Sequence, residues 1–286
     1  MTRRMPTPRT PRPSPNRSAA SLIGAGLLIL AAGCTELSEL NPQSESILDI
    51  FRQPSPAEAV NDAQNPYDAD KRARGTLLLA TADFASEPLY VELFVTGMSD
   101  TEASVRAASC KALARNGGPT HAPLMIKALA DPDVGVRAEA ARALQRIHSP
   151  DAILPLINAL REPDSANPTQ TAEDEPEVRA EAALALGQYR RANVLQALIA
   201  ALRDSRLAVN RNTLASLRTL TGQDFGYDPG AWLAWLDSTS SPFAGAAVYL
   251  YPAYNRDWRW YEYFPFVPKP PVEAASTPAG LPIRPQ

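Results

Sequence analysis

The sequence predicts an all-α protein: a solenoid of about five helix-pair repeats, with an N-terminal signal before it and an irregular tail after it. The main observation is a Val-Arg pair followed by alanines. It occurs at Val105-Arg106, Val136-Arg137 and Val178-Arg179, with a degenerate copy at Val209-Asn210, at spacings of 31, 42 and 31 residues. Apolar residues around each pair recur at helical spacing. The middle spacing is a 31-residue unit that carries an 11-residue insertion, so the underlying period is 31 residues. A fixed period of this kind is typical of stacked units that share one core.

Residues 1–33 have the organisation of a secretory signal. The first 17 residues contain five arginines and no acid, and an apolar run from Leu22 to Ala32 then leads to Gly33-Cys34. The run is shorter than the roughly 20 residues of a transmembrane helix. Residues 30–34 (LAAGC) resemble a bacterial lipobox, with Ala31 where that motif usually has leucine. The resemblance implies lipidation of Cys34; the alternatives are an ordinary cleaved signal or an uncleaved anchor.

Composition after residue 33 agrees with an envelope protein. The remaining chain has 23 basic and 31 acidic residues, a net charge of −8, which argues against nucleic-acid binding. If Cys34 carries lipid, Cys110 has no disulfide partner. We expect Cys110 to be a small buried residue; a reactive thiol is the alternative. The predicted location is periplasm-facing, with the outer membrane favoured over the inner because Thr35 rather than Asp follows the cysteine.

The mature chain divides into three predicted parts. Residues 34–69 are polar and contain four prolines, which predicts a flexible tether. Residues 70–237 carry the helical pattern of the solenoid and its capping helix. Residues 238–286 form an aromatic and then proline-rich tail.

Each repeat is predicted to consist of two helices. The first follows an acidic or proline-containing turn and carries the Val-Arg pair and the alanines, and the second is largely apolar. In the clearest unit one apolar face contains Val136, Ala140, Ala143, Leu144 and Ile147. Second helices are expected over 124–129, 156–160 and 198–202. A weaker first unit is placed at Ala73-Arg74, with helices over 74–83 and 89–96.

This pattern resembles the HEAT repeats of the bilin-lyase-like type over roughly residues 70–222. The family's Asp-x-x-Val-Arg-x-x-Ala-Ala-x-Ala-Leu core is matched best at 133–144, and then at 178–186 with Glu175 in place of the aspartate. The resemblance implies that Arg106, Arg137 and Arg179 form a structural ladder between adjacent units. A row of arginines that binds phosphate or carboxylate ligands is the alternative.

Two features interrupt the repeat. Residues 162–175 (EPDSANPTQTAEDE) form an acidic insertion, interpreted as a tolerated surface loop or as a contact loop for a partner. After the repeats, Gly222 suits a left-handed cap, and Asp228-Pro229 begins a short helix. Trp232 and Trp235 on that helix predict a lid over the last unit, with a carbohydrate platform as the alternative.

The tail is rich in aromatic residues. Residues 243–266 hold ten of the chain's twenty aromatics, and the runs 247–251 and 258–263 could pair as a β-hairpin. One interpretation is that the tail folds back on the solenoid. The other is that it binds a partner protein or glycan through Trp258, Trp260, Tyr261 and Tyr263.

The functional prediction follows from the period, the signal and the residues present. Two histidines are too few for the two-iron site of the HEAT-repeat hydroxylases, and the sequence shows no phosphate loop, zinc motif or nucleophile elbow. We therefore expect no enzyme, catalytic residue, metal, cofactor or small-molecule substrate. The prediction is a non-catalytic protein-interaction scaffold, lipid-anchored in the bacterial envelope, with partner unidentified. The alternative is a peptidoglycan- or glycan-binding lipoprotein that acts through the tail.

Overall fold

The computed structural model describes residues 55–163, 173–252, 257, 259–264 and 274–282, and gives only the backbone of Tyr261. The predicted signal, Cys34 and most of the insertion lie outside these residues. Residues 54–286 form one compact unit. Across the described ranges the regular structure is eleven α-helices and short 3₁₀ turns, which confirms the all-α fold. None of these helices combines the length and hydrophobicity that spanning a bilayer requires.

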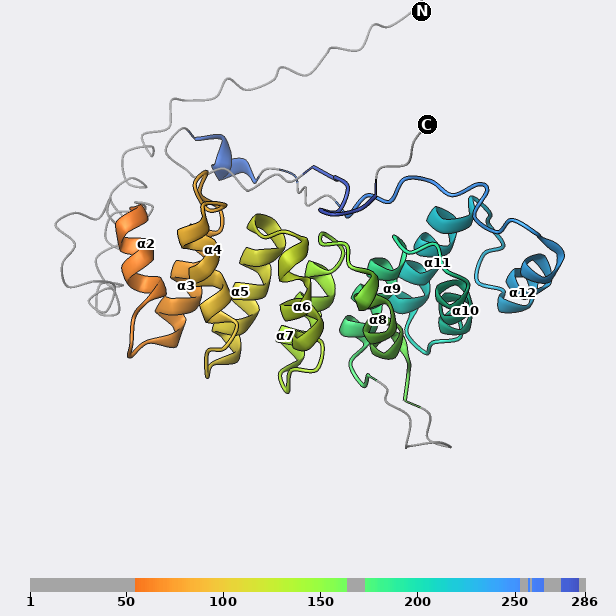
Figure 1. The fold of residues 1–286 in the computed structure, drawn as a ribbon, viewed down its shortest axis with the longest axis horizontal. Helices are drawn as coiled ribbons and strands as arrows, with labels where there is room; N and C mark the ends of the chain where they lie inside the picture. The colour runs from red at the N-terminus through yellow and green to blue at the C-terminus, as the bar shows by residue number, and fades with distance from the viewer. Residues whose placement is uncertain (1–54, 164–172, 253–256, 258, 265–273, 283–286) are drawn as a thin grey trace, which may run out of the picture. The chain divides into compact units, whose positions relative to one another are not determined.

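Ten of the helices form five consecutive pairs, as the period predicts, and follow one another along the solenoid (Figure 1). The pairs are α3 (Ala69–Leu79) with α4 (Pro88–Gly97), α5 (Ala103–Asn116) with α6 (Ala122–Ala128), α7 (Val134–Ala143) with α8 (Ile153–Leu160), α9 (Pro176–Leu186) with α10 (Ala192–Ala201), and α11 (Leu207–Thr221) with α12 (Pro229–Ser238).

The helices lie in two layers. Each first helix contacts the first helix of the next repeat, in the series α3, α5, α7, α9 and α11. The second helices form the other layer, and α4, α6, α8 and α10 each contact the first helix of the following repeat. One repeat alone therefore leaves apolar faces uncovered, and stacking buries them in a shared core.

Alanines allow the first helices to pack closely. Ala140, Ala141, Ala182 and Ala183 are fully buried, so α7 and α9 contact each other through side chains of a single methyl group. Cys110 occupies the same place in α5 and is also fully buried, with its Sγ 3.5 Å from the Met98 sulfur. Burial raises the pKa of the Cys110 thiol to about 12, as expected for a packing residue rather than a reactive thiolate.

The structure differs from the predicted tether over residues 56–63. This segment forms helix α2 (Pro56–Ala63), which begins with a capping box between Ser55 and Glu58. Its buried Ala59 and Ala63 pack on α3, where Gly75 leaves no room for a side chain against the α2 backbone. Helix α2 therefore covers the first repeat and acts as its N-terminal cap.

At the other end, α12 covers the last repeat. Its N-cap Asp228 accepts hydrogen bonds from the N–H groups of Gly230 and Ala231, and Gly222 at the end of α11 has a left-handed φ of 70°. Trp232 is fully buried, donates its indole N–H to the Gly226 carbonyl at 2.9 Å and meets Phe225 edge-on. These contacts are those of the lid rather than of an exposed carbohydrate platform.

The described part of the tail returns along the solenoid (Figure 1). The Ala247 N–H donates to the Thr219 carbonyl of α11, and Ala279 exchanges hydrogen bonds with the backbone of Arg146 and His148 after α7. The β-hairpin prediction is wrong: Tyr251 pairs with Ser276, and residues 260–263 form the 3₁₀ turn η5 (Trp260–Tyr263). Long-range bonds to solenoid carbonyls thus replace a local hairpin.

Candidate functional site

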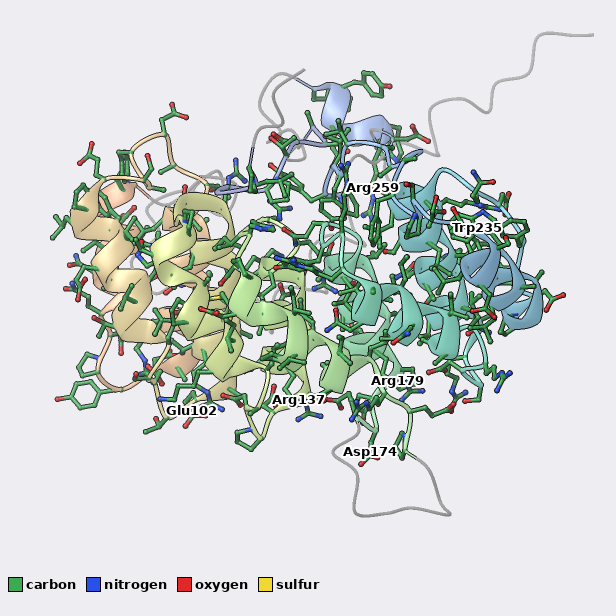
Figure 2. All side chains as sticks on the ribbon, turned by 45° about the vertical axis from the view of Figure 1, so that its right-hand side comes forward. Glu102, Arg137, Asp174, Arg179, Trp235 and Arg259 are labelled. Carbon is green, nitrogen blue, oxygen red and sulfur yellow. The ribbon has the colours of Figure 1, made fainter. Side chains whose placement is uncertain are left out.

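The most regular polar feature is a ladder of arginines on one edge of the solenoid. Arg106 makes a two-pronged contact with the Asp131 carboxylate, with both N–O distances 2.8 Å. Arg137 contacts Glu173 in the same way at 2.8 and 2.9 Å, and Arg179 contacts Asp204 at 2.7 and 3.2 Å. Figure 2 shows Arg137 and Arg179 along the same edge as Glu102 and Asp174.

The carboxylate residues link each repeat to the next. Asp131 receives Arg106 on its side chain, while its backbone carbonyl accepts a hydrogen bond from Arg137 six residues later. Its side chain also accepts the N–H of Asp133 at the start of the next helix. Glu173 has the same contacts with Arg137, Arg179 and the N–H of Glu175. One residue therefore joins two arginines and a helix start.

The ladder extends one repeat further than the sequence prediction. The first repeat was placed at Ala73-Arg74, but α3 begins at Ala69 and its ladder arginine is Arg72, which contacts Asp100 at 2.8 and 2.9 Å. Arg74 instead pairs with Asp62 of α2, with 61% of its side chain exposed. Asp68 caps the N-terminus of α3, so the helix begins earlier than the sequence predicts. Arg72 rather than Arg74 therefore takes the ladder position.

The sequence reasoning also missed the acidic partners. In four repeats an acid lies six residues before the ladder position: Asp100, Asp131, Glu173 and Asp204. This constant spacing is the signal that could have found them. The same spacing places Glu173 in the ladder, although the sequence predicts that it belongs to the insertion. Only 8% of the Glu173 surface is exposed.

The ladder ends without a buried unpaired charge. The degenerate position Asn210 donates to the Asp204 carbonyl at 3.0 Å, which is the contact the arginines make to the residue six before them. The side-chain oxygen of Asn210 has no hydrogen-bond partner. The chain also has no acidic residue at the position where a following repeat would provide the carboxylate. A neutral amide at this position avoids the cost of an unpaired guanidinium.

Ion pairing shifts the pKa values of the ladder groups. Hydrogen bonds from Arg72 lower the pKa of Asp100 below its ordinary value, against burial, which raises it. At Asp131 burial is the largest influence and raises the pKa, but the hydrogen bonds from Arg106 and the Asp133 N–H together outweigh it, so the net shift is downward. Both carboxylates are therefore ionised well below neutral pH.

A groove lies between α8 and α10 in the second layer. Its volume is about 850 Å³, and its lining includes Leu154, Ile157, Ala197 and Ala200. Neither helix contains a charged residue. Leu154 is 65% exposed, whereas Ile157 is buried in the floor. The base of the acidic insertion forms one end of the groove.

The charged rim of this groove is unequally paired. Asp204 is held by Arg179, and Glu162 accepts hydrogen bonds from the N–H and hydroxyl of Ser205. Among the described residues the exposed side chains of Arg161 and Arg203 have no hydrogen-bond or ionic partner. The groove therefore combines an apolar floor with two available positive charges.

The proposed binding residues of the tail are only partly described. Trp258 and the Tyr261 side chain lie outside the described residues, while Trp260 and Tyr263 are 77% and 70% exposed. Arg259 lies on the edge opposite the ladder (Figure 2). In the ranges that the structure covers, no cluster of three His, Cys, Asp or Glu side chains could hold a metal ion.

The two layers, the period and the ladder define the protein as an α-solenoid of HEAT-type repeats. The family model for HEAT repeats matches residues 91–174, and the model for the PBS lyase HEAT-like repeat matches residues 178–204. None of the curated proteins compared with the chain matches it.

Two solved structures are similar to this chain. The Escherichia coli protein YibA aligns at a TM-score of 0.46 and 18% identity, over 72% of this chain and 77% of that one. The complex of CpcE and CpcF of phycocyanin lyase from Nostoc sp. PCC7120 aligns at a TM-score of 0.39 and 19% identity, over 63% of this chain and 80% of that one.

These findings correct the prediction that the chain is not an enzyme. The finding that overturns it is the family match: residues 178–204 match a repeat that is named for a lyase. The sequence reasoning failed because it searched for local catalytic motifs. A solenoid can assemble a site from side chains of several repeats, and no local motif would then show it.

The ladder contact of Arg179 predicts a large loss of stability on its removal. Arg179→Gln leaves Asp204, whose side chain is 1% exposed, as an unpaired buried charge. We expect the free energy of unfolding to fall by about 3–5 kcal/mol, measured by urea denaturation followed by circular dichroism. The control Arg74→Gln, at an exposed pair, should cost below about 1 kcal/mol. Equal losses in the two variants would contradict a special role for the ladder.

The lowered pKa values of Asp100 and Asp131 predict acid sensitivity. Their contribution to stability is fully present above the unfolded value of about 4, and is lost as pH falls through the lower folded values. The melting temperature of the protein should therefore fall when the pH is lowered below about 4. Asp131→Asn should lower the melting temperature at pH 7 and flatten its acid dependence. The control is Asp151→Asn, an exposed position outside the ladder. An unchanged acid slope in Asp131→Asn would contradict the assignment.

Proposed function

We propose that the protein is a protein-interaction scaffold whose docking surface is the groove between α8 and α10. The supporting observation is the combination of an apolar floor and two unpaired arginines. Exposed apolar surface of this kind is costly unless another molecule covers it. Glu162 and Pro163, at the base of the insertion, line one end of the groove, which supports the interpretation of the insertion as a contact loop.

The chemistry of the groove defines the class of partner. Leu154 and the small Ala197 and Ala200 accommodate apolar side chains of a docked segment. Arg161 and Arg203 favour a carboxylate at its end, because the acids of the rim are already paired. The proposed partner is thus an apolar protein segment that carries acidic residues.

We propose further that the scaffold is lipid-anchored at Cys34 and faces the periplasm, with the outer membrane favoured. The support is the basic, apolar and small-residue order of residues 1–34 and the acidic composition of the rest. An anchored scaffold would recruit its partner to the membrane surface.

A second candidate function is glycan binding through the tail. The exposure of Trp260 and Tyr263 favours it, because exposed aromatic rings stack on sugars. The buried Tyr249 and the hydrogen-bonded Ala247 and Ala279 belong to the solenoid surface, so η5 alone would carry this role.

Selection from a random peptide library tests the groove. Purified full-length protein should enrich apolar peptides with Asp or Glu. Ala200→Asp should weaken their binding at least 10-fold, because it places a charge in the apolar floor, and Arg203→Glu should do the same by repulsion. Ala234→Asp and Arg211→Glu change exposed positions on α12 and α11 and should leave the affinity unchanged.

Two outcomes would contradict the groove. One is peptide binding that Ala200→Asp and Arg203→Glu leave unaltered. The other is no peptide enrichment together with sedimentation on peptidoglycan that Trp260→Ala abolishes, which would favour the tail as the binding element.

Mass spectrometry of the protein purified from a bacterial membrane fraction tests the anchor. We expect an N-terminal Cys34 that carries a diacylglyceryl group, and Cys34→Ser should move the protein out of the membrane fraction. Cys110→Ser is the matched control and should not move it. An unmodified N-terminal cysteine, or a first residue other than Cys34, would overturn the anchor.

A further inference from the structure

A second cavity lies on the edge where the tail returns over the solenoid. Its volume is about 650 Å³, within the range of small-molecule sites. Three segments form it: residues 148–153 after α7, residues 187–191 after α9, and the tail residues 247–249 with 277, 281 and 282. The cavity is separate from the groove between α8 and α10, with which it shares no lining residue.

Hydrogen bonds hold the walls in place. Ala279 accepts from the His148 N–H at 2.9 Å and donates to the Arg146 carbonyl at 2.7 Å. The Ala247 carbonyl accepts from Arg190 at 3.0 Å, and the Arg146 guanidinium lies 4.7 Å from the centre of the Tyr251 ring. The tail is therefore a fixed wall of the cavity, which is preformed in the free protein.

One wall is aromatic and uncharged. The His148 and Tyr189 rings stack at 4.9 Å with an interplanar angle of 29°. His148 Nδ1 lies 2.9 Å from the Gln188 amide oxygen, and the Ser149 N–H donates to the Tyr189 hydroxyl. Burial lowers the pKa of His148, so its ring is neutral at pH 7. Because Tyr189 is buried, the half-buried His148 ring is the part of this stack that a ligand can contact.

One hydroxyl group is buried behind the lining of the cavity. Tyr249 is 7% exposed, and its hydroxyl has no hydrogen-bond partner. Burying a hydroxyl without a partner costs about 1–3 kcal/mol. Burial also raises the pKa of Tyr249, so the hydroxyl keeps its proton. The hydroxyl oxygen is itself buried, so a ligand in the cavity does not reach it.

The charge of the lining is positive. Its charged residues are Arg190 and Arg191, and no acid lines the cavity. One Arg190 nitrogen is bonded to Ala247, whereas the exposed Arg191 side chain has no hydrogen-bond or ionic partner among the described residues. The guanidinium group matches a carboxylate through two parallel hydrogen bonds.

We propose that this cavity binds a planar, apolar carboxylate. The ring system packs beside the stacked rings of His148 and Tyr189, and the carboxylate pairs with Arg191. The site is independent of the protein-docking groove. Nothing in the proposal requires a covalent step.

A matched set of aromatic acids and amides tests the proposal. The probes are benzoate, 2-naphthoate and 9-anthroate, each with its neutral carboxamide, titrated into the full-length protein by saturation-transfer NMR and calorimetry. At least one acid should bind at least 5-fold more tightly than its amide. Arg191→Gln should remove this preference, whereas Arg203→Gln, at an exposed arginine of the other groove, should retain it.

Tyr249→Phe provides the second readout. It should leave binding of the acid unchanged, because the hydroxyl is buried behind the lining, and leave the melting temperature of the ligand-free protein unchanged or higher, because it removes an unsatisfied hydroxyl. Failure of all six probes to bind, or binding that Arg191→Gln does not alter, would overturn the proposal. Weaker binding of the acid to Tyr249→Phe would also contradict this geometry, because the buried hydroxyl would then have to reach the ligand.

Discussion

This solenoid depends on one interaction. Each ladder arginine pairs with a carboxylate in the segment that leads into the first helix of the next repeat. Hydrophobic stacking holds repeats together, but it is non-directional and tolerates small rotations. A planar guanidinium that contacts both carboxylate oxygens and a backbone carbonyl fixes direction. Because Asp131 and Glu173 each join two arginines, the angle between adjacent repeats is set at every junction.

The ladder also explains how the chain accommodates its irregularities. The insertion stretches one period to 42 residues, yet Glu173 returns to the ladder and α7 still contacts α9. At the C-terminal end, Asn210 replaces the arginine where no acid follows, and Trp232 closes the core. At the N-terminal end α2 covers the first repeat. The two ends and the insertion are thus compatible with a regular stack of repeats between them.

Function is expected where the regular contacts stop. The arginines of the ladder are occupied by carboxylates, which leaves no free row for ligands. Arg161, Arg203 and Arg191 lie outside the ladder and beside a groove or cavity. These positions separate the proposed protein-docking surface from the proposed small-molecule site.

The sequence by itself determined the period, the helix pairs and the C-terminal lid, because helical spacing and N-cap bonds act over a few residues. It marked Val136, Ala140 and Trp232 as core and Asp228 as a cap, and the structure agrees. Tertiary structure decided which acid meets each arginine, since partners lie 25 to 36 residues apart. It also decided that α2 packs, that Tyr251 pairs with Ser276, and that the tail encloses a cavity. These contacts form only once the repeats are stacked, so no local pattern records them.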